Sequence, residues 1–390
     1  MSKKIETLLV QAGRKGTREY GYVNPPLKRG STVLYPDMAT KLSVGQHWLE
    51  PVEIYGLCGT ETHFALEAAL AELEGGLRAQ VTSSGLSAIT VPLLAYLRAG
   101  EHLLVPDSVY GPTRTFCDGF LRRYGVETTY YDPQATPEAL ALLFKANTRI
   151  LFTESPGSHT FEVQDIPALA AVAHARGAKV FLDNTWGIGH FAPFAHGVDV
   201  SIHALTKYPG GHSDIILGAV VVNAEEDWRW LRNGSLELGN YASPDDCWLA
   251  LRGLHTLHVR LKAQEASGLK LARWLEKRPE IARVLHPALA SCPGHELWKR
   301  DFTGSCGLFG AVFQPRYSAA EVVRFIDALE HFGIGASWGG FESLVLPTTG
   351  TIKRSEGTGV FDGHAARFHV GLENADDLIA DLEQALGVLG

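Results

Sequence analysis

Short apolar segments and longer segments with helical spacing follow one another along the chain up to about residue 222. The segment 102–105 (HLLV) is typical of a buried strand, whereas in 62–74 the apolar residues recur at helical spacing before a Gly-Gly stop. The strands are predicted near 79–83, 102–105, 126–131, 149–153, 180, 200 and 216–222, and the helices at 62–74, from 86 to about 98, and at 110–124, 137–144 and 166–176. This alternation predicts an α/β fold with a large, mostly parallel seven-stranded sheet covered by helices.

After about Gly253 the pattern changes. A long amphipathic helix is predicted at 254–277, and helices are predicted at 319–331 and 375–389. Strand-like segments lie near 308–313 and 343–346. We therefore expect a main domain at 58–253 and a smaller α+β domain at 254–390.

The first 57 residues are rich in turn formers and have little periodicity. Asn24-Pro25-Pro26 and Tyr35-Pro36 interrupt any helix. A segment of this kind cannot form a core of its own and has to pack against something else. We interpret 1–57 as an arm that crosses to a second subunit.

Composition narrows the class of protein. The net charge is -8 and no Lys/Arg cluster forms a basic stripe, which argues against a nucleic-acid partner. The five cysteines are scattered and contain no CxxC pair, so we expect neither disulfides nor a zinc site. The spacing of the histidines predicts no metal cluster. No segment resembles a signal peptide or a membrane span, and we expect a cytoplasmic enzyme without a membrane partner.

Two predicted strands end in residues that carry chemistry. Asp183 ends the strand 179–183, and Lys207 follows the strand near 200 and precedes Pro209-Gly210-Gly211. The carboxyl ends of parallel strands line the ligand crevice of an open sheet. An acid and an amine delivered there suit pyridoxal phosphate (PLP), whose ring nitrogen needs a carboxylate and whose aldehyde needs a lysine.

One turn is a candidate phosphate site, although many helices that begin with Ser-Gly bind nothing. The strand near 80 turns through Ser83-Ser84-Gly85 into a helix. Small residues at the start of a helix leave backbone N–H groups free, and together with the helix dipole these groups bind phosphate.

With these residues in place, the chain resembles the Cys/Met-metabolism family of fold-type I PLP-dependent enzymes, and within it most closely the bacterial cystathionine β-lyases. The resemblance covers nearly the whole chain in order. Its motifs are Tyr55-Gly56, Gly59-Thr60, Glu72-Leu73-Glu74-Gly75-Gly76, Ser83-Ser84-Gly85, Thr206-Lys207-Tyr208, Gly211-His212-Ser213-Asp214, the segment from His295 to Gly304, Ser337-Trp338-Gly339-Gly340 and the segment from Arg367 to Glu373.

The resemblance implies roles for individual residues. Lys207, Tyr110 and Asp183 would be catalytic, as the Schiff-base lysine, the residue stacked on the ring and the partner of the pyridine nitrogen. The cofactor would be bound by Tyr55, Gly85, Leu86, Tyr110, Asp183, Thr206 and Lys207, with Gly85 and Leu86 offering backbone N–H groups, Thr206 a hydroxyl, and Tyr55 reaching over from a neighbouring subunit. Arg367, helped by Ser337 and Trp338, would bind the α-carboxylate of a small amino-acid substrate.

The resemblance also implies an activity and an assembly. The activity is β-elimination of L-cystathionine to homocysteine, pyruvate and ammonia, a step in methionine synthesis. The assembly is a homotetramer built from two dimers, with active sites shared across each dimer interface.

Two positions depart from the family pattern. Leu57 stands where the family normally carries an arginine that helps to hold the phosphate, and Trp248 stands where a tyrosine is expected near the entrance. Both changes make the pocket less polar where cystathionine carries its second charged group. A lyase for more apolar cysteine S-conjugates, or γ-elimination, β-substitution or racemisation, therefore stays open, and so does a PLP-binding regulator without turnover.

Overall fold

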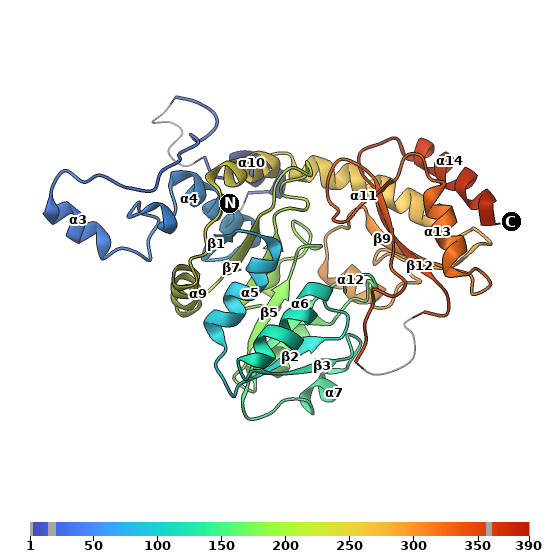
Figure 1. The fold of residues 1–390 in the computed structure, drawn as a ribbon, viewed down its shortest axis with the longest axis horizontal. Coiled ribbons are helices and arrows are strands. Elements are labelled where there is room, and N and C mark those ends of the chain that lie inside the picture. Colours follow the sequence, from blue (N-terminus) through green and yellow to red (C-terminus); the bar gives the residue numbers. More distant parts are fainter. Residues whose placement is uncertain (1–2, 15–20, 356–360, 390) are drawn as a thin grey trace. The chain divides into compact units, whose positions relative to one another are not determined.

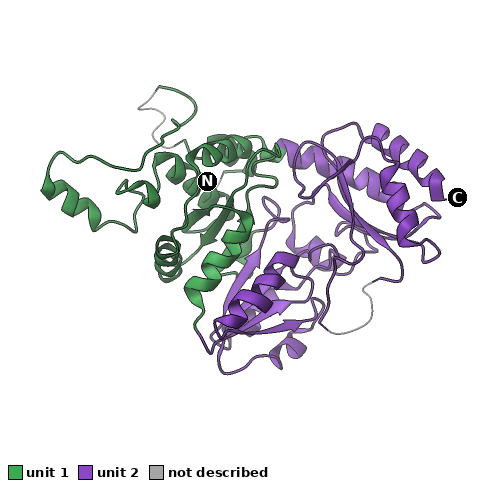
Figure 2. Cartoon of the chain, in the orientation of Figure 1, with its two compact units in different colours: residues 1–98, 192–258 green, residues 99–191, 259–390 purple. Residues whose placement is uncertain are grey.

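The computed structural model describes residues 3–14, 21–355 and 361–389, and they form two compact units (Figure 2). Unit 1 comprises Met1–Arg98 with Ala192–His258, and unit 2 comprises Ala99–Phe191 with Val259–Gly390. Of the predicted arm, 1–2 and 15–20 lie outside the described residues, as do 356–360 and 390 of the predicted C-terminal domain. The predicted boundaries at 57 and 253 stay a prediction.

The larger sheet has seven strands, of which three belong to unit 1. These are β1 (Arg78–Thr82), β7 (Gly218–Val222) and β6 (Val200–Ala204), with β7 antiparallel to both of its neighbours. Strand β7 has the sequence GAVVV and all five residues are buried, which suits a central strand covered on both faces. Its direction is why the sheet is mostly, and not entirely, parallel.

Helix α4 (Glu61–Glu74) shows how the sequence fixes an element of unit 1. At its start, the backbone N–H of Thr60 donates to Nδ1 of His63 at 3.0 Å, and the Thr60 side chain completes a capping box. At its end, Gly75 adopts a left-handed conformation with φ of 72°. The helix predicted at 62–74 is confirmed.

The other helices of unit 1 surround its strands. Helices α5 (Gly85–Tyr96) and α9 (Glu225–Glu237) contact each other and β1, while α10 (Pro244–Leu254) packs on α4. The N-terminal part carries the helices α1 (Ile5–Gln11) and α3 (Met38–Gly45). The short helical turns η1 (Gly56–Cys58) and η3 (Pro193–His196) complete the unit.

Unit 2 holds the four parallel strands of the larger sheet. Their order is β5 (Lys179–Asp183), β4 (Thr148–Glu154), β2 (His102–Pro106) and β3 (Glu127–Tyr131). Between them run α6 (Gly111–Phe116), which continues as the π-helical η2 (Cys117–Leu121), α7 (Pro137–Ala141) and α8 (Ile166–His174). All four strands were predicted within a few residues.

A second sheet of five strands also belongs to unit 2 (Figure 1). Its order is β10 (Gly333–Ile334), β11 (Leu344–Pro347), β12 (Ala365–His369), β9 (Leu308–Phe313) and β8 (Ile281–Leu285). It is accompanied by α11 (Leu257–Leu275), α12 (His295–Asp301), α13 (Ala319–Asp327), α14 (Ala375–Leu386) and η4 (Gly387–Leu389). This second sheet, together with the larger one, confirms the predicted α/β fold class.

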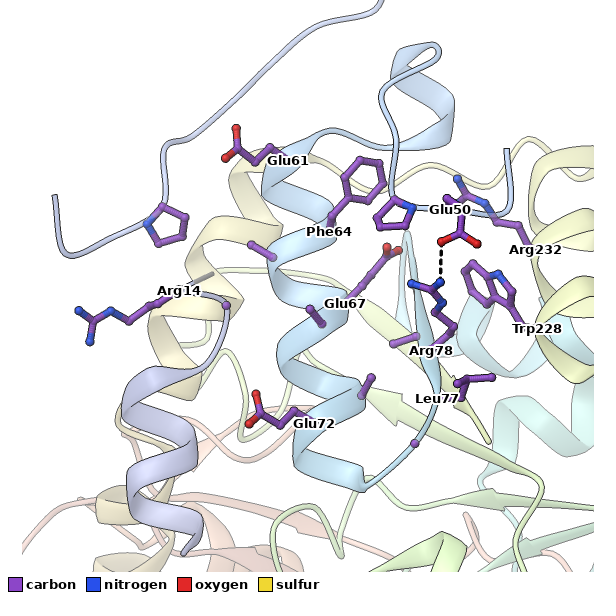
Figure 3. A pocket seen from close by; sticks show the side chains of 18 of the residues that line it. Arg14, Glu50, Glu61, Phe64, Glu67, Glu72, Leu77, Arg78, Trp228 and Arg232 are labelled. Carbon is purple, nitrogen blue, oxygen red and sulfur yellow. Dashed lines mark hydrogen bonds and ion pairs between the residues drawn. The ribbon is translucent and has the colours of Figure 1, made fainter. Parts of the chain in front are cut away.

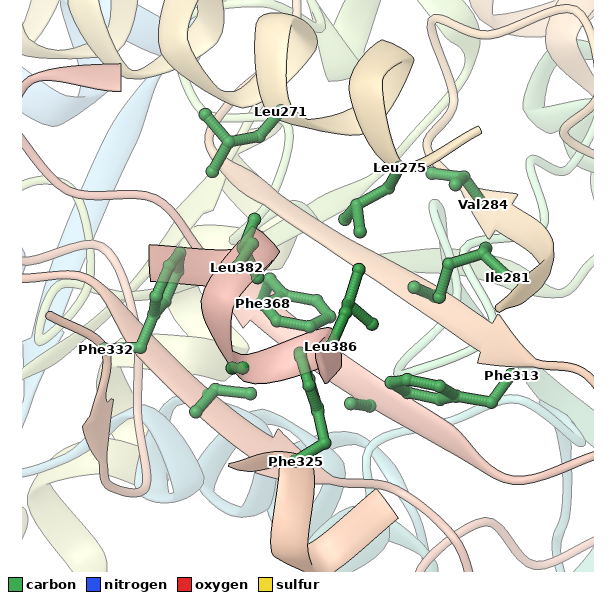
Figure 4. Packing of buried hydrophobic residues seen from close by; sticks show 14 of the residues in the cluster. Leu271, Leu275, Ile281, Val284, Phe313, Phe325, Phe332, Phe368, Leu382 and Leu386 are labelled. Carbon is green, nitrogen blue, oxygen red and sulfur yellow. The ribbon is translucent and has the colours of Figure 1, made fainter. Parts of the chain in front are cut away.

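The core of the second sheet is aromatic. Phe368 on β12 packs against Phe309, Phe325 and Phe332, with ring centroids 5.7–6.5 Å apart, and apolar side chains of α11 and α14 surround them (Figure 4). Such pairs add to the burial of apolar area. Because β12 also carries Arg367, this core holds a predicted substrate-binding residue on a rigid strand.

The structure corrects several predicted elements. The helix predicted at 254–277 begins at Leu257, because α10, which was not predicted, ends at Leu254. The helices predicted at 319–331 and 375–389 end at Asp327 and Leu386. Strands β8 and β12 and helices α3 and α12 were not predicted.

Candidate active site

Each unit carries some of the predicted site residues. In unit 1, Lys207 follows β6 in a tight turn. Its backbone N–H donates to the carbonyl of Ala204 at 3.1 Å, and its carbonyl accepts from Gly211 N–H at 2.8 Å. Gly211 has φ of 69°, a conformation that glycine adopts without strain. The turn therefore fixes the backbone that presents the half-buried Lys207 side chain.

The start of α5 has free donors. Ser84 is the N-cap, and its hydroxyl accepts from Ser87 N–H at 3.1 Å while Ser87 Oγ accepts from Ser84 N–H at 2.8 Å. These reciprocal bonds leave the amides of Gly85 and Leu86 without a partner inside the helix. Leu86 is 40% exposed and Gly85 is partly exposed, so a ligand can reach this helix start. An anion such as a phosphate fits this helix start.

The start of α5 packs directly against β6, the strand before Lys207. A Cβ atom on Gly85 would lie 2.5 Å from the Cβ of Ala204, which is too close for two carbon atoms. Glycine at position 85 is therefore needed for α5 to begin against β6. The contact places the free amides of unit 1 close to the strand that leads to Lys207.

Thr206 already uses its hydroxyl. Oγ1 donates to the carbonyl of Leu217 at 3.1 Å and accepts from Leu217 N–H at 3.0 Å. A hydroxyl has a single proton to donate, so donation to a phosphate requires that the bond to the Leu217 carbonyl be given up. The role of Thr206 in phosphate binding stays a prediction.

Two residues singled out from the sequence lie in the arm or contact it. Tyr55 is 53% exposed. Trp248 donates its indole N–H to the carbonyl of Pro25 at 3.1 Å, so it anchors the arm to α10. Arg232 Nη2 donates to the carbonyl of Cys58, the residue after Leu57, at 2.6 Å.

In unit 2, Asp183 ends β5 with one carboxylate oxygen satisfied. Oδ1 accepts from Thr185 N–H at 3.1 Å and from Thr185 Oγ1 at 2.6 Å. Two donors to one oxygen stabilise the ionised form of a carboxyl group. This arrangement suits a carboxylate that pairs with a protonated ring nitrogen.

Tyr110 interacts electrostatically with Asp183. It is 42% exposed and caps α6, and its backbone N–H donates to Oε2 of Glu154 at 2.8 Å. Burial of the hydroxyl, followed by the nearby carboxyl groups of Asp183 and Glu154, raises the pKa of Tyr110. The phenol therefore stays protonated at neutral pH, and its partly exposed ring can cover a flat ligand.

Arg367 is a buried cation on β12. It is 7% exposed, Nη2 donates to the carbonyls of Ser337 at 3.0 Å and Gly335 at 3.4 Å, and Nε is buried without a hydrogen-bond partner. Burial lowers its pKa. Among the described residues, no Asp or Glu pairs with it, so its charge is available for an anionic ligand.

Ser337 and Trp338 belong to the segment between β10 and β11, whose backbone accepts hydrogen bonds from this arginine. Ser337 adopts φ of 77°, a strained conformation for a non-glycine residue, and offers its backbone carbonyl, not its hydroxyl, to Arg367. Trp338 is half-buried. Ser337 is therefore in contact with Arg367, and Trp338 follows it in the connection that precedes β11.

Two further residues near these groups were not predicted. Glu154 ends β4, and the same strand-end argument that selected Asp183 could have selected it. His159 has φ of 63°, and its Nδ1 is buried without a hydrogen-bond partner. Burial and then the charge of Arg367 lower the pKa of His159 to about 4, so its ring is neutral at physiological pH. The sequence around His159 contains no signal for its positive φ.

A hollow of about 1320 Å³ lies on unit 1 along α4 (Figure 3). Its lining includes Phe64, Glu67, Arg78 and Trp228, with an ion pair between Arg78 and Glu50 at 2.6 Å. None of the predicted cofactor or substrate residues lines it. It is therefore a surface distinct from the predicted chemistry of unit 1.

In the described parts of the chain, no group of three or more His, Cys, Asp or Glu residues could hold a metal ion. His203 Nε2 lies 2.8 Å from Glu74 Oε2 in the core of unit 1, and His369 Nε2 accepts from Gly339 N–H at 3.1 Å. A search of the described residues finds no helix with the length and apolarity of a membrane span.

The chemical groups that these residues offer are those that PLP needs. Unit 1 offers an amine and free helix amides for a phosphate, and unit 2 offers a carboxylate, a partly exposed aromatic ring and a buried arginine with no acidic partner among the residues that the structure describes. This combination on an α/β fold defines the class of PLP-dependent enzymes that act on amino acids.

Comparison with known proteins agrees. The chain matches the Cys/Met metabolism PLP-dependent enzyme family over residues 6–387, and it belongs to this family. Its cofactor is therefore pyridoxal phosphate. A cystathionine β-lyase of Bordetella avium is 43% identical, over 99% of this chain and 98% of that protein. An L-alanine/L-glutamate racemase of Wolbachia pipientis is 38% identical, over 99% and 98%. The crystal structure of metB from Corynebacterium glutamicum superposes with a TM-score of 0.90 at 30% identity, covering 100% and 99% of the two chains.

Proposed function

We propose that this protein is a PLP-dependent carbon–sulfur lyase that catalyses β-elimination of L-cystathionine to homocysteine, pyruvate and ammonia. The observation that carries the proposal is Arg367, a buried guanidinium without an acidic partner in the described chain. A planar guanidinium binds a carboxylate through two parallel hydrogen bonds, which is what recognition of an α-amino acid requires. The β-lyase relatives support the choice of substrate.

PLP, when bound, supplies an electron sink for the charge that develops at the substrate Cα. The chain supplies the rest. Arg367 orients the α-carboxylate, and Asp183 holds the proton of the ring nitrogen. Lys207 Nζ takes the proton from Cα and returns a proton to the departing sulfur. Tyr110 covers the ring, and the amides of Gly85 and Leu86 bind the phosphate.

A second candidate is a lyase for uncharged cysteine S-conjugates. It is favoured by Leu57 and Trp248, which replace polar residues of the family, and Trp248 uses its indole N–H on the arm. Racemisation, the activity in the name of the Wolbachia pipientis relative, would draw on Lys207 and Arg367 of this chain as well. These activities are alternatives to the elimination of cystathionine at one site.

We also propose that the protein works in the cytoplasm as a homotetramer, with Tyr55 reaching a neighbouring active site. Apolar side chains of the arm support a subunit contact, since Tyr22, Val23 and Leu34 are 79%, 66% and 91% exposed. Exposed apolar groups of this kind gain free energy when a second copy covers them.

Product analysis separates the candidate activities. Pyruvate, 2-oxobutyrate and D-amino acid are measured after incubation with L-cystathionine, an uncharged cysteine conjugate and L-alanine, with Lys207→Ala as the control. The proposal predicts pyruvate from L-cystathionine at the highest kcat/KM, and none with Lys207→Ala. A higher kcat/KM for the uncharged conjugate, or D-alanine as the main product, contradicts it.

A further inference from the structure

Glu154 is a buried carboxyl group to which the proposed roles assign nothing. It is the last residue of β4, and its register partner on the parallel strand β5 is Asp183. Two acids therefore end neighbouring strands at the same edge of the sheet. Glu154 is 9% exposed, and Asp183 is the more exposed of the two.

Glu154 holds the backbone of the ring-covering residue. Its Oε2 accepts the N–H of Tyr110 at 2.8 Å. Tyr110 caps α6, so its amide has no role inside the helix. The side chain of Glu154 thus fixes the point from which the Tyr110 ring projects.

Two adjacent carboxylates cannot both be ionised at low cost in a buried site. Burial, and after it the charge of Asp183, raise the pKa of Glu154 well above its usual value. Tyr110, whose pKa is raised by burial and by these carboxyl groups, stays protonated at neutral pH. Asp183 is more exposed and accepts two bonds from Thr185, so the single charge of the pair is more stable on Asp183.

We propose that Glu154 is a positioning residue of the cofactor site, a neutral carboxyl that fixes the Tyr110 backbone and leaves the single negative charge of the pair on Asp183. The inference rests on the proposed function, because the ring that Tyr110 covers and Asp183 faces is that of PLP. It follows that position 154 requires a side-chain oxygen and does not require a charge.

Two variants separate these requirements. Glu154→Gln keeps an oxygen for the Tyr110 amide and is neutral at every pH, whereas Glu154→Ala removes the oxygen. PLP affinity, the visible circular dichroism of bound PLP and the pH midpoint of its visible absorption band are measured for both. The surface variant Glu127→Gln, whose parent residue pairs with Lys145, is the control. For Glu154→Gln we expect PLP affinity and dichroism within about twofold of the native values and an unchanged pH midpoint. For Glu154→Ala we expect about tenfold weaker PLP binding and reduced dichroism.

Two results overturn the inference. A pH midpoint in Glu154→Gln displaced by about one unit or more means that Glu154 is ionised in the native protein. If Glu154→Ala keeps the native PLP affinity and dichroism, Glu154 does not position Tyr110. If Glu154→Ala does not fold, the infrared difference spectrum between native protein and Glu154→Gln decides: a protonated-carboxyl band at neutral pH supports the inference, and its absence overturns it. The infrared measurement needs no cofactor, so failure to take up PLP counts against the proposed function and leaves this test in force.

Discussion

A Cβ atom on Gly85 would lie 2.5 Å from the Cβ of Ala204. This contact joins the start of α5, with its free amides, to the strand that ends just before Lys207. The spacing between the phosphate-binding amides and the lysine turn within unit 1 therefore depends on the absence of a side chain at position 85.

Gly85→Ala is expected to push α5 away from β6 and weaken PLP binding about tenfold or more, because overpacking of this kind costs about 1–3 kcal/mol. PLP affinity is measured by fluorescence titration. Gly119→Ala is the control, since no atom lies within 4 Å of a Cβ there. The double variant Gly85→Ala with Ala204→Gly removes the 2.5 Å contact, leaves one of 3.1 Å to the Cα of residue 204, and should recover part of the affinity. Native affinity in Gly85→Ala alone would rule out the packing argument.

Arg367→Met is expected to raise KM for amino-acid substrates by about 10- to 150-fold, because a charge-assisted hydrogen bond contributes about 1.5–3 kcal/mol. The thermal midpoint should stay the same or rise, since the variant removes a buried cation that lacks an acidic partner. Steady-state kinetics and thermal unfolding measure the two effects.

Arg149→Met, which breaks a surface pair with Glu101, is the control for Arg367→Met. An amine analogue that lacks the α-carboxylate should bind the native protein and Arg367→Met equally. If KM for the amino acid does not change in Arg367→Met, the carboxylate lies elsewhere.

Glu67 makes stability depend on pH. Burial raises its pKa to about 7, and the charges of Arg232 and Arg78 oppose the shift. The folded value exceeds the unfolded one, so the stabilisation from neutral Glu67 is complete below about pH 4.5 and is lost as the pH rises to about 7. Because Glu67 is only partly buried as a residue, we expect a loss of roughly 1–3 kcal/mol over this range.

Glu67→Gln keeps the oxygen that accepts Val81 N–H at 3.0 Å and should remove this pH dependence. Urea unfolding at pH 5 and pH 8 measures the effect, with Glu72→Gln on the exposed face of the same helix as the control. An unchanged slope of stability with pH in Glu67→Gln would show that another group is responsible.

Leu57→Arg restores the cation that the family normally carries two positions after Tyr55. If the new guanidinium reaches the phosphate, PLP affinity should rise by about 10- to 150-fold. Leu57→Gln, which adds polarity without charge, is the control. Equal affinity of Leu57→Arg and the native protein would mean that position 57 does not face the phosphate.

The sequence predicted most of the α/β alternation because those elements depend on local patterns. Helix α4 has a capping box and a glycine stop, and its limits were predicted to within a residue. Strand β12 was missed because its sequence, AARFH, has little apolar alternation, and its five residues are buried by partners distant in the chain. The antiparallel direction of β7 depends on non-local pairing and leaves no mark in the sequence.

Some misses had local signals. Helix α10 begins with Ser243 as N-cap, Pro244 at its first position and two acids in its first turn, which are standard start signals. In the candidate site, strand ends identified Asp183 and Lys207, and the same signal was available for Glu154. The conformation of His159 and the lack of an acidic partner for Arg367 follow from tertiary packing, so only the structure could reveal them.

The central claim is that Lys207 holds the cofactor covalently. Native protein supplied with PLP is reduced with borohydride, digested and mapped by mass spectrometry, with Lys207→Ala and Lys179→Ala treated in parallel. We predict a visible absorption band before reduction and a phosphopyridoxyl group on the peptide that contains Lys207, retained in Lys179→Ala. A protein that stays colourless with PLP, or a label on any other lysine, would contradict the account.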